Sequence, residues 1–479
     1  MDGPVQELDG GQWLAKKIDI MKLQKMVIFS LLLSIGARAG KAPSDPVNSP
    51  PSATADSFPT GRVIASVGCQ QDAGQSYALY IPVKRRKTTS PVIYFFDPHG
   101  AGALPLCKYK SLAEEFGFIL IGSNNSKNGN DWSTTETMWN VLSEDTRKRL
   151  PLDPDRIYTA GFSGGAKVAS YVALHHPGIK GVLAGGAGLP DGTRAGDFAF
   201  SFTALAGQGD MNRTDLIAIT GELDKTRTRH RLISFEGIHE WAPDNTMRIA
   251  FAGLQLDAMR QGGTLPPDTP FIDQYVKSSQ KRIAVYYQAG QLLKAEEECR
   301  LSLRLMEGLP ADSDWFKKKE AALIANPLYG QQQREQQRLL VIEQNKKAEY
   351  QGHFQQEDRD YWIRTINGLQ ILARGKTNAS AMNQRLLAYL SLAFYSFSNR
   401  LINGNENQGA RYFVELYKIA DPANTEAWYF SAILHVREGH APEAEKDIDR
   451  AIEYGFRDRS RLEQQPEFKG RMSRIKIPK

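Results

Sequence analysis

Between residues 61 and 262 the hydrophobic residues form short runs, separated by longer and mostly polar stretches. The run at 76–82 alternates apolar and polar residues with a period of two, which predicts an outer strand. The other runs are almost continuously apolar, as is typical of parallel strands covered on both faces; they lie at 91–96, 118–122, 181–184, 200–206 and 231–235. Helix-like segments lie between several of these runs, and 244–259 predicts a closing helix. The pattern therefore predicts an α/β fold with a doubly wound, mostly parallel sheet.

A different pattern begins after the segment 261–270, which holds two glycines and three prolines. Glycine and proline at this density indicate a break between domains. We therefore expect an α/β domain at 61–262, a linker at 263–270 and an all-helical domain at 271–479. Within the helical domain, 331–360 is rich in charge and predicts a long solvated helix or a connection.

The clearest internal repeat lies at 391–458 and has a period of 34 residues. Large and small residues recur at matching positions in two copies, and Pro422 closes the first copy: Phe394, Ser398, Ala410 and Val414, then Trp428, Ala432, Ala444, Ile448 and Ala451. The pattern resembles tetratricopeptide repeats, in which small residues let paired helices approach closely. Such repeats commonly bind proteins, so the resemblance implies a protein partner, with a structural cap or a dimer surface as the alternative.

The first 60 residues have the pattern of an exported protein rather than of a folded domain. Lys22 and Lys25 precede the apolar run 26–35, and 37–39 reads Ala-Arg-Ala, a cleavage signal. This order predicts a signal peptide over 1–39 and a periplasmic or secreted protein. The run is about half as long as the ~20 residues that a membrane-spanning helix needs, and an uncleaved anchor is the alternative. Met21 could be the true start. The Pro-, Ser- and Ala-rich residues 40–60 predict a disordered linker.

Composition and charge exclude some functions. The 479-residue chain has 41% hydrophobic and 24% charged residues and a formal net charge of +6, spread along its length. Without a basic block and interleaved aromatic residues, nucleic-acid binding has little support. Cys69, Cys107 and Cys299 are too widely spaced for a metal motif. Cys69 and Cys107 could form a disulfide, or all three could be free thiols. We expect no metal and no cofactor.

The strongest chemical signal is the pentapeptide Gly161-Phe162-Ser163-Gly164-Gly165. It lies between the strand-like run 156–160 and the helix-like run 166–172. A serine on such a tight turn projects its Oγ away from the backbone, and the new helix supplies free N–H groups beside the reacting carbon. We predict that Ser163 is a nucleophile, in a turn that resembles the nucleophile elbow of α/β-hydrolases.

A serine nucleophile needs a base and an acid that orients the base. In α/β-hydrolases the chain order is serine, acid, histidine. Of the eight histidines, His239 lies just past the last predicted strand, where the base belongs. The acid should follow the strand before that one, and Asp210 meets this requirement. The competitors Asp215, Glu222 and Asp224 lie in a helix-like segment that would turn them away from the site.

The oxyanion of a tetrahedral intermediate needs two N–H donors that are already in place. We predict the backbone of Gly164 as one donor, and the backbone of Gly100 or Ala101, in the loop after the second apolar strand, as the other. Losing one such donor costs about 3–4 kcal/mol in kcat. Asp97 is expected to brace this loop.

Together, these motifs resemble compact secreted esterases grouped with polyhydroxybutyrate depolymerases and feruloyl esterases. The resemblance covers about 200 residues, and its matching segments are 77–82, His99-Gly100, 153–158, 161–165 and 237–243. It implies Ser163 as nucleophile, His239 as base and Asp210 as acid. The chain departs from the family's pattern where Gly164-Gly165 replaces the more usual Met-Gly, and in the residues around the acid.

The spacing of the strands also limits the kind of substrate. Only about ten residues, 187–196, separate the strand after the elbow from the next, which leaves no room for a large helical lid. We therefore expect an open site for bulky or polymer-attached esters of a carbohydrate or an aromatic acid. Trp132, Trp139 and Trp241 are candidates to line it, with core packing as the alternative. Two other functions stay open: a peptidase of the prolyl-oligopeptidase type, and a repeat scaffold with an inactive hydrolase domain.

Overall fold

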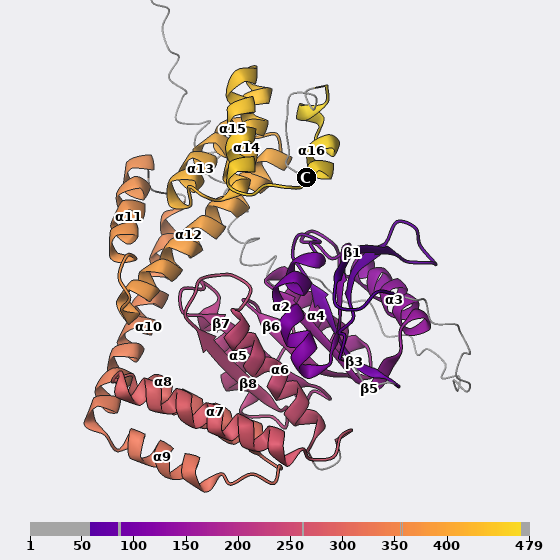
Figure 1. Cartoon of the computed structure of the whole chain (residues 1–479). Helices are drawn as coiled ribbons and strands as arrows, with labels where there is room; N and C mark the ends of the chain where they lie inside the picture. Colours follow the sequence, from indigo (N-terminus) through magenta and orange to yellow (C-terminus); the bar gives the residue numbers. More distant parts are fainter. Residues whose placement is uncertain (1–57, 85–87, 261–262, 355, 357, 471–479) are drawn as a thin grey trace, which may run out of the picture. The chain divides into compact units, whose positions relative to one another are not determined.

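The computed structural model of the protein describes residues 58–84, 88–260, 263–354, 356 and 358–470. The predicted signal peptide and nearly all of the predicted 40–60 linker lie outside the described residues. Strands and helices alternate in the first half of the described chain (Figure 1): β1 (Val63–Gly68), β2 (Ser76–Tyr80), β3 (Ser90–Phe96), α2 (Ala103–Phe116), β4 (Ile119–Ser123), α3 (Trp132–Arg149), β5 (Leu152–Phe162), α4 (Gly164–His175), β6 (Ile179–Gly185), β7 (Ser201–Gly207), α5 (Arg213–Leu223), β8 (His230–Phe235) and α6 (Asp244–Ala258).

After α6 the described residues form helices only, as the sequence predicts: α7 (Thr269–Gln288), α8 (Leu292–Met306), α9 (Asp314–Ile324), α10 (Pro327–His353), α11 (Arg359–Leu372), α12 (Asn378–Asn403), α13 (Asn407–Ala420), α14 (Thr425–Arg437), α15 (Ala441–Glu453), α16 (Arg459–Gln464) and the short 3₁₀ helix η1 (Pro466–Phe468).

The eight described strands form one sheet in the order β1-β2-β4-β3-β5-β6-β7-β8. β2 pairs antiparallel with β1 and β4, whereas the pairs β4–β3, β3–β5, β5–β6, β6–β7 and β7–β8 are parallel. Parallel strands bring their carboxyl ends to one edge of the sheet, and the loops there carry the functional residues of open α/β folds. The predicted fold class is confirmed: an α/β-hydrolase sheet is followed by a helical region.

Alternate side chains of the central strands enter two different cores. Ile93 and Phe95 of β3 pack with residues of α2 and α6, whereas Tyr94 and Phe96 pack with residues of α3, α4 and α5. The strands therefore have helices on both faces (Figure 1). This double burial explains why the sequence of β3 is apolar throughout.

The strand β1 has no counterpart among the predicted elements. It forms an end of the sheet, and most of its residues are partly or fully exposed. Its pairing with β2 also shifts in register between Ile64 and Val67. An exposed, irregular edge strand lacks the continuous apolar run that identified the other strands.

The chain divides into two compact units, but not at the predicted linker. The first unit runs to Gln208 and includes Asn212–Glu335, and the second comprises Gly209–Met211 and Gln336 onward. The division thus falls within α10 rather than at 263–270. The reason is packing, because Ile272 of α7 and Leu305 of α8 are buried in the same core as the sheet helices. The Gly- and Pro-rich segment marks the end of the strands, not the end of the core.

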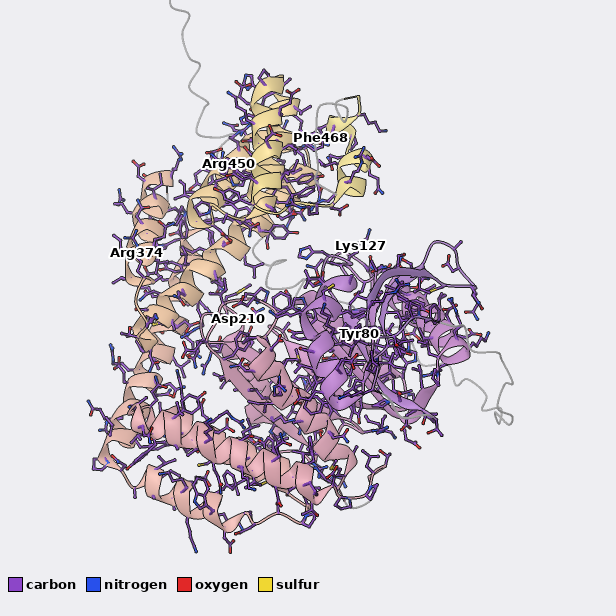
Figure 2. All side chains as sticks on the ribbon, in the orientation of Figure 1. Tyr80, Lys127, Asp210, Arg374, Arg450 and Phe468 are labelled. Carbon is purple, nitrogen blue, oxygen red and sulfur yellow. The ribbon has the colours of Figure 1, made fainter. Side chains whose placement is uncertain are left out.

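Within the second unit, α12 packs with α13 and α14 packs with α15. The positions of the 34-residue pattern are buried, apart from the partly exposed Trp428: Phe394, Ser398, Ala410, Val414, Ala432, Ala444, Ile448 and Ala451. Figure 2 labels Arg450 on α15, whose guanidinium lies 5.7 Å from the centre of the Trp428 ring. The pattern thus identified residues that pack between helices, and the tetratricopeptide assignment itself stays a prediction.

The three cysteines are unpaired: Cys69 and Cys299 are buried and Cys107 is exposed. Of the two alternatives that the sequence leaves open, the free thiols apply. Along the part of the chain that the structure describes, no helix has the length and the apolar character needed to cross a membrane.

Candidate active site

Ser163 lies on the sharp turn between β5 and α4. Its backbone has φ 53° and ψ −123°, a conformation that residues with a side chain rarely adopt. The turn is so tight that two neighbours must be glycine: a Cβ on Gly161 would collide with the carbonyl of Gly165, and one on Gly165 with the carbonyl of Phe96. These glycines let the strand and the helix approach closely enough to project the serine hydroxyl.

His239 follows β8 and lies beside the serine. Its Nε2 is 3.0 Å from Oγ of Ser163, a hydrogen-bond distance. The imidazole packs against the ring of Phe162, with 4.6 Å between ring centroids. Gly186, at φ 64°, lies close to both rings: a Cβ there would lie 2.8 Å from Cε2 of Phe162, 2.9 Å from Cε1 of His239 and 3.0 Å from its Nδ1. The structure thus brings together the predicted nucleophile and base, which are 76 residues apart in sequence.

Trp241 holds the histidine loop rather than forming a free aromatic surface. Its Nε1 donates a 3.1 Å hydrogen bond to Oδ2 of Asp97, and its ring packs against Phe95, Tyr109 and Phe162. The hydroxyl of Tyr109 donates a 2.7 Å bond to the carbonyl of the next residue, Ala242. These contacts fix the loop that carries His239, and the predicted substrate-binding role of Trp241, which is partly exposed, stays a prediction.

Asp97 braces its own loop, as predicted. Its Oδ1 accepts hydrogen bonds from the N–H groups of His99 at 2.8 Å and of Ala101 at 3.4 Å. Burial by itself would raise the pKa of this carboxyl, but the hydrogen bonds from His99 and Trp241 outweigh burial and hold the pKa below its usual value. Asp97 is therefore a charged anchor between the loop after β3 and the loop after β8.

Asp210, the predicted acid, comes three residues after the end of β7 and is labelled in Figure 2. Its side chain is 1% exposed. The competitors Asp215 and Glu222 lie on α5, as the helical pattern predicts, and Asp224 follows that helix. Oδ1 of Asp224 instead lies 3.0 Å from Nε2 of His230 and accepts a 2.6 Å hydrogen bond from Nη2 of Arg304.

The two predicted contributors to the oxyanion site differ in their geometry. Gly164 is the first residue of α4, where an N–H has no partner within its own helix. At the other contributor, the N–H groups of Gly100 and Ala101 are hydrogen-bonded within their own loop, and their predicted oxyanion role stays a prediction. The N–H of Gly100 donates to the carbonyl of Asp97 at 3.2 Å, and that of Ala101 to the Asp97 carboxylate.

The predicted aromatic wall of Trp132 and Trp139 does not form. Trp139 is 1% exposed and packs edge-on against Tyr94, at 4.9 Å between ring centroids, so it belongs to the core. Trp132 is partly exposed and stacks on Tyr171 of α4 at 4.5 Å. Both lie on α3, and the helix turns one ring inward and lays the other on its neighbour. Core packing, the alternative, applies to Trp139.

Sequence reasoning missed two residues near the elbow, Gly186 and Asn128. Gly186 lies against His239, and Nδ2 of Asn212 donates a 2.8 Å hydrogen bond to the carbonyl of Gly186. Asn128, in the loop before α3, lies against Gly164. Neither residue belongs to a recognisable motif, and only the fold brings them to the serine. Among the described residues, no cluster of His, Cys, Asp or Glu could hold a metal ion.

No protein-family model matches the sequence, and no curated protein matches it either. Among solved structures, the chain is similar to an esterase of the archaeon Pyrobaculum calidifontis, with 12% identity, a TM-score of 0.34, and coverage of 42% of this chain and 85% of that one. It is also similar to a thermostable carboxylesterase from a metagenomic library, with 13% identity, a TM-score of 0.35, and coverage of 42% of this chain and 90% of that one. For a putative dienelactone hydrolase of Klebsiella pneumoniae the identity is 14%, the TM-score is 0.28, and the coverage is 37% of this chain and 88% of that one. The fold assignment rests on the strand order and pairing of the sheet.

Proposed function

We propose that this protein is a serine hydrolase that cleaves carboxylic esters through an acyl-enzyme on Ser163. One observation carries the proposal: a serine in a strained turn between a strand and a helix, with Nε2 of a histidine 3.0 Å from its Oγ. Strained non-glycine backbone is retained where the surrounding structure enforces it, which is common at catalytic sites.

The reaction proceeds in two halves. Oγ of Ser163 forms a bond to the ester carbonyl carbon while its proton passes to Nε2 of His239, and the carbonyl π pair moves onto oxygen. The N–H of Gly164 stabilises this oxyanion. When the carbonyl reforms, the bond to the alcohol oxygen breaks and the alcohol takes the proton from His239. Water then repeats the sequence on the acyl-enzyme and releases the acid.

Asp210 is our proposal for the acid that orients His239. It follows β7, the strand before the one that leads to the histidine, which is where the chain order of the fold expects it. A buried carboxylate suits the role because it stabilises the imidazolium that forms during the reaction.

We place the substrate among bulky or polymer-attached esters of a carbohydrate or an aromatic acid, as in the depolymerase and feruloyl esterase group that the sequence resembles. The connection 186–200 between β6 and β7 contains no helix, so it supplies no helical lid. Export by the signal peptide at 1–39 would bring the enzyme to such substrates. The helical repeats are proposed to hold a protein partner.

The test is active-site labelling of the full chain with a fluorophosphonate probe. Wild type should be labelled, and Ser163→Ala should not. Hydrolysis of short-chain nitrophenyl esters, compared with aminoacyl amides, separates an esterase from a peptidase of the prolyl-oligopeptidase type. A wild-type protein that neither reacts with the probe nor turns over either substrate would refute the proposal and favour an inactive scaffold.

A further inference from the structure

Asn128 is a polar neighbour of the nucleophile elbow that has no role in the reaction as described above. It is exposed and lies in the loop between β4 and α3. Its carboxamide lies against Gly164: a Cβ built on Gly164 would collide with Oδ1 of Asn128 and would lie 3.1 Å from Cγ and 3.7 Å from Nδ2. The amide is therefore beside the residue whose N–H is the first oxyanion donor.

The other asparagines of this loop use their side chains to build it. Nδ2 of Asn124 donates to the carbonyl of Ala65, that of Asn125 to the carbonyl of Gly74, and that of Asn130 to the carbonyl of Asn125. Among the described residues, the carboxamide of Asn128 has no hydrogen-bond partner. An asparagine side chain that does not hold its own loop is available to a ligand.

The backbone around Asn128 is fixed, so its side chain is presented from a firm position. The N–H of Asn128 donates a 2.8 Å hydrogen bond to the carbonyl of Pro98, and Lys127 forms a β-bridge with His99. The loop of Asn128 is thus fastened to the loop that the sequence predicted to supply the second oxyanion donor. In that predicted loop, the N–H groups of Gly100 and Ala101 are directed at Asp97.

We propose that the side chain of Asn128 supplies the second oxyanion donor, together with the backbone N–H of Gly164. A half-turn about its terminal torsion exchanges Oδ1 and Nδ2 without changing the shape of the amide. A developing oxyanion attracts the NH₂ group and repels the oxygen, so it selects the orientation that donates. Asn128 transfers no proton: the proton of Ser163 goes to His239, and the oxyanion receives a hydrogen bond only.

The inference rests on the proposed function and is tested with Asn128→Ala and Asn128→Asp in the full chain. The aspartate has the same shape but no N–H, so both variants should lose about 10²–10³-fold in kcat, the usual cost of one oxyanion donor. KM for a nitrophenyl ester should change little. Affinity for a trifluoromethyl ketone, which forms a tetrahedral adduct with its own oxyanion, should fall by the same factor as kcat/KM. Lys127→Ala, an exposed neighbour in the same loop, is the control and should keep wild-type kinetics.

The outcomes separate this inference from the proposed function. If wild type reacts with the fluorophosphonate and turns over esters, but Asn128→Asp keeps wild-type kcat, Asn128 merely fills space and the inference is refuted. A loss of kcat without a matching loss of affinity for the ketone refutes it as well. A wild-type protein that does not react with the probe refutes the proposed function itself. Circular dichroism of each variant checks that the fold is intact.

Discussion

At Ser163, backbone strain and chemistry meet in one residue. A residue with a side chain at φ 53° and ψ −123° costs of order 1–3 kcal/mol, whereas glycine adopts such a conformation readily. The strain is enforced by the close approach of Gly161 and Gly165. The hydroxyl thus projects from the turn at a cost in stability.

The first prediction follows from this strain. Ser163→Gly and Ser163→Ala both remove the hydroxyl, but only glycine relieves the backbone. We expect Ser163→Gly to be more stable than Ser163→Ala by about 1 kcal/mol in urea unfolding. The matched control is Ser396, exposed within α12, where glycine should instead be less stable than alanine by about 1 kcal/mol. Equal midpoints for the two Ser163 variants would contradict the strain.

Single residues also show where sequence patterns reach their limit. Ser163 and His239 follow from motif and chain order, because the fold places each type at a known strand end. The indole of Trp139 is buried and that of Trp132 is partly exposed, although both tryptophans come from the same helix. Asn128 has no motif around it. Its position against Gly164 depends on a loop that only the folded chain brings there.

At the scale of elements, the candidate active site depends on two loops that are held together by one buried carboxylate. Asp97 directly follows β3, and its carboxylate accepts hydrogen bonds from its own loop and from Trp241, which follows β8. Because the folded state lowers the pKa of Asp97, its ionised form stabilises the protein. This contribution is present above the unfolded pKa of about 3.9 and is lost as the pH falls through the folded value.

The second prediction concerns this anchor. Asp97→Asn should lose about 2 kcal/mol of stability at pH 7, because hydrogen bonds to a charged group are replaced by weaker ones. The gap between wild type and variant in urea unfolding should shrink as the pH falls below about 4. Asp131, an exposed helix cap, offers a comparison away from the two loops. A gap for Asp97→Asn that stays constant from pH 7 to pH 3 would show that its charge does not contribute.

At the scale of the whole molecule, the two compact units have separate buried cores. The core of the second unit includes Leu339 of α10, Leu386 of α12 and Val414 of α13. It also contains an ion pair: Nη2 of Arg385 donates to Oε2 of Glu343 at 2.7 Å, and Glu343 is 0% exposed. The charged segment 331–360 is therefore mostly helix, but it is not wholly solvated.

The third prediction uses this pair. Arg385→Met removes one of the two cations paired with the buried Glu343 carboxylate and leaves only Lys347, 3.0 Å from Oε1, which should cost about 3 kcal/mol. In calorimetry of the full chain, the transition of the second unit should fall by roughly 10 °C, while that of the first unit should stay in place. Arg459→Met is the control, since its exposed pair with Glu463 should contribute under about 1 kcal/mol. An equal shift of both transitions would contradict the independent unfolding of the first and second units.

The sequence by itself determined the order of strands β2 to β8, the change to helices after them, the serine between β5 and α4 and the histidine after the last strand. These features are local, since hydrophobic periodicity and short turns depend on residues that are close together in the sequence. Only the tertiary structure decided where the first core ends, which tryptophans are buried and which loop amide lies against Gly164. Each of these depends on contacts between residues far apart in the chain, and the pattern of neighbours does not encode such contacts.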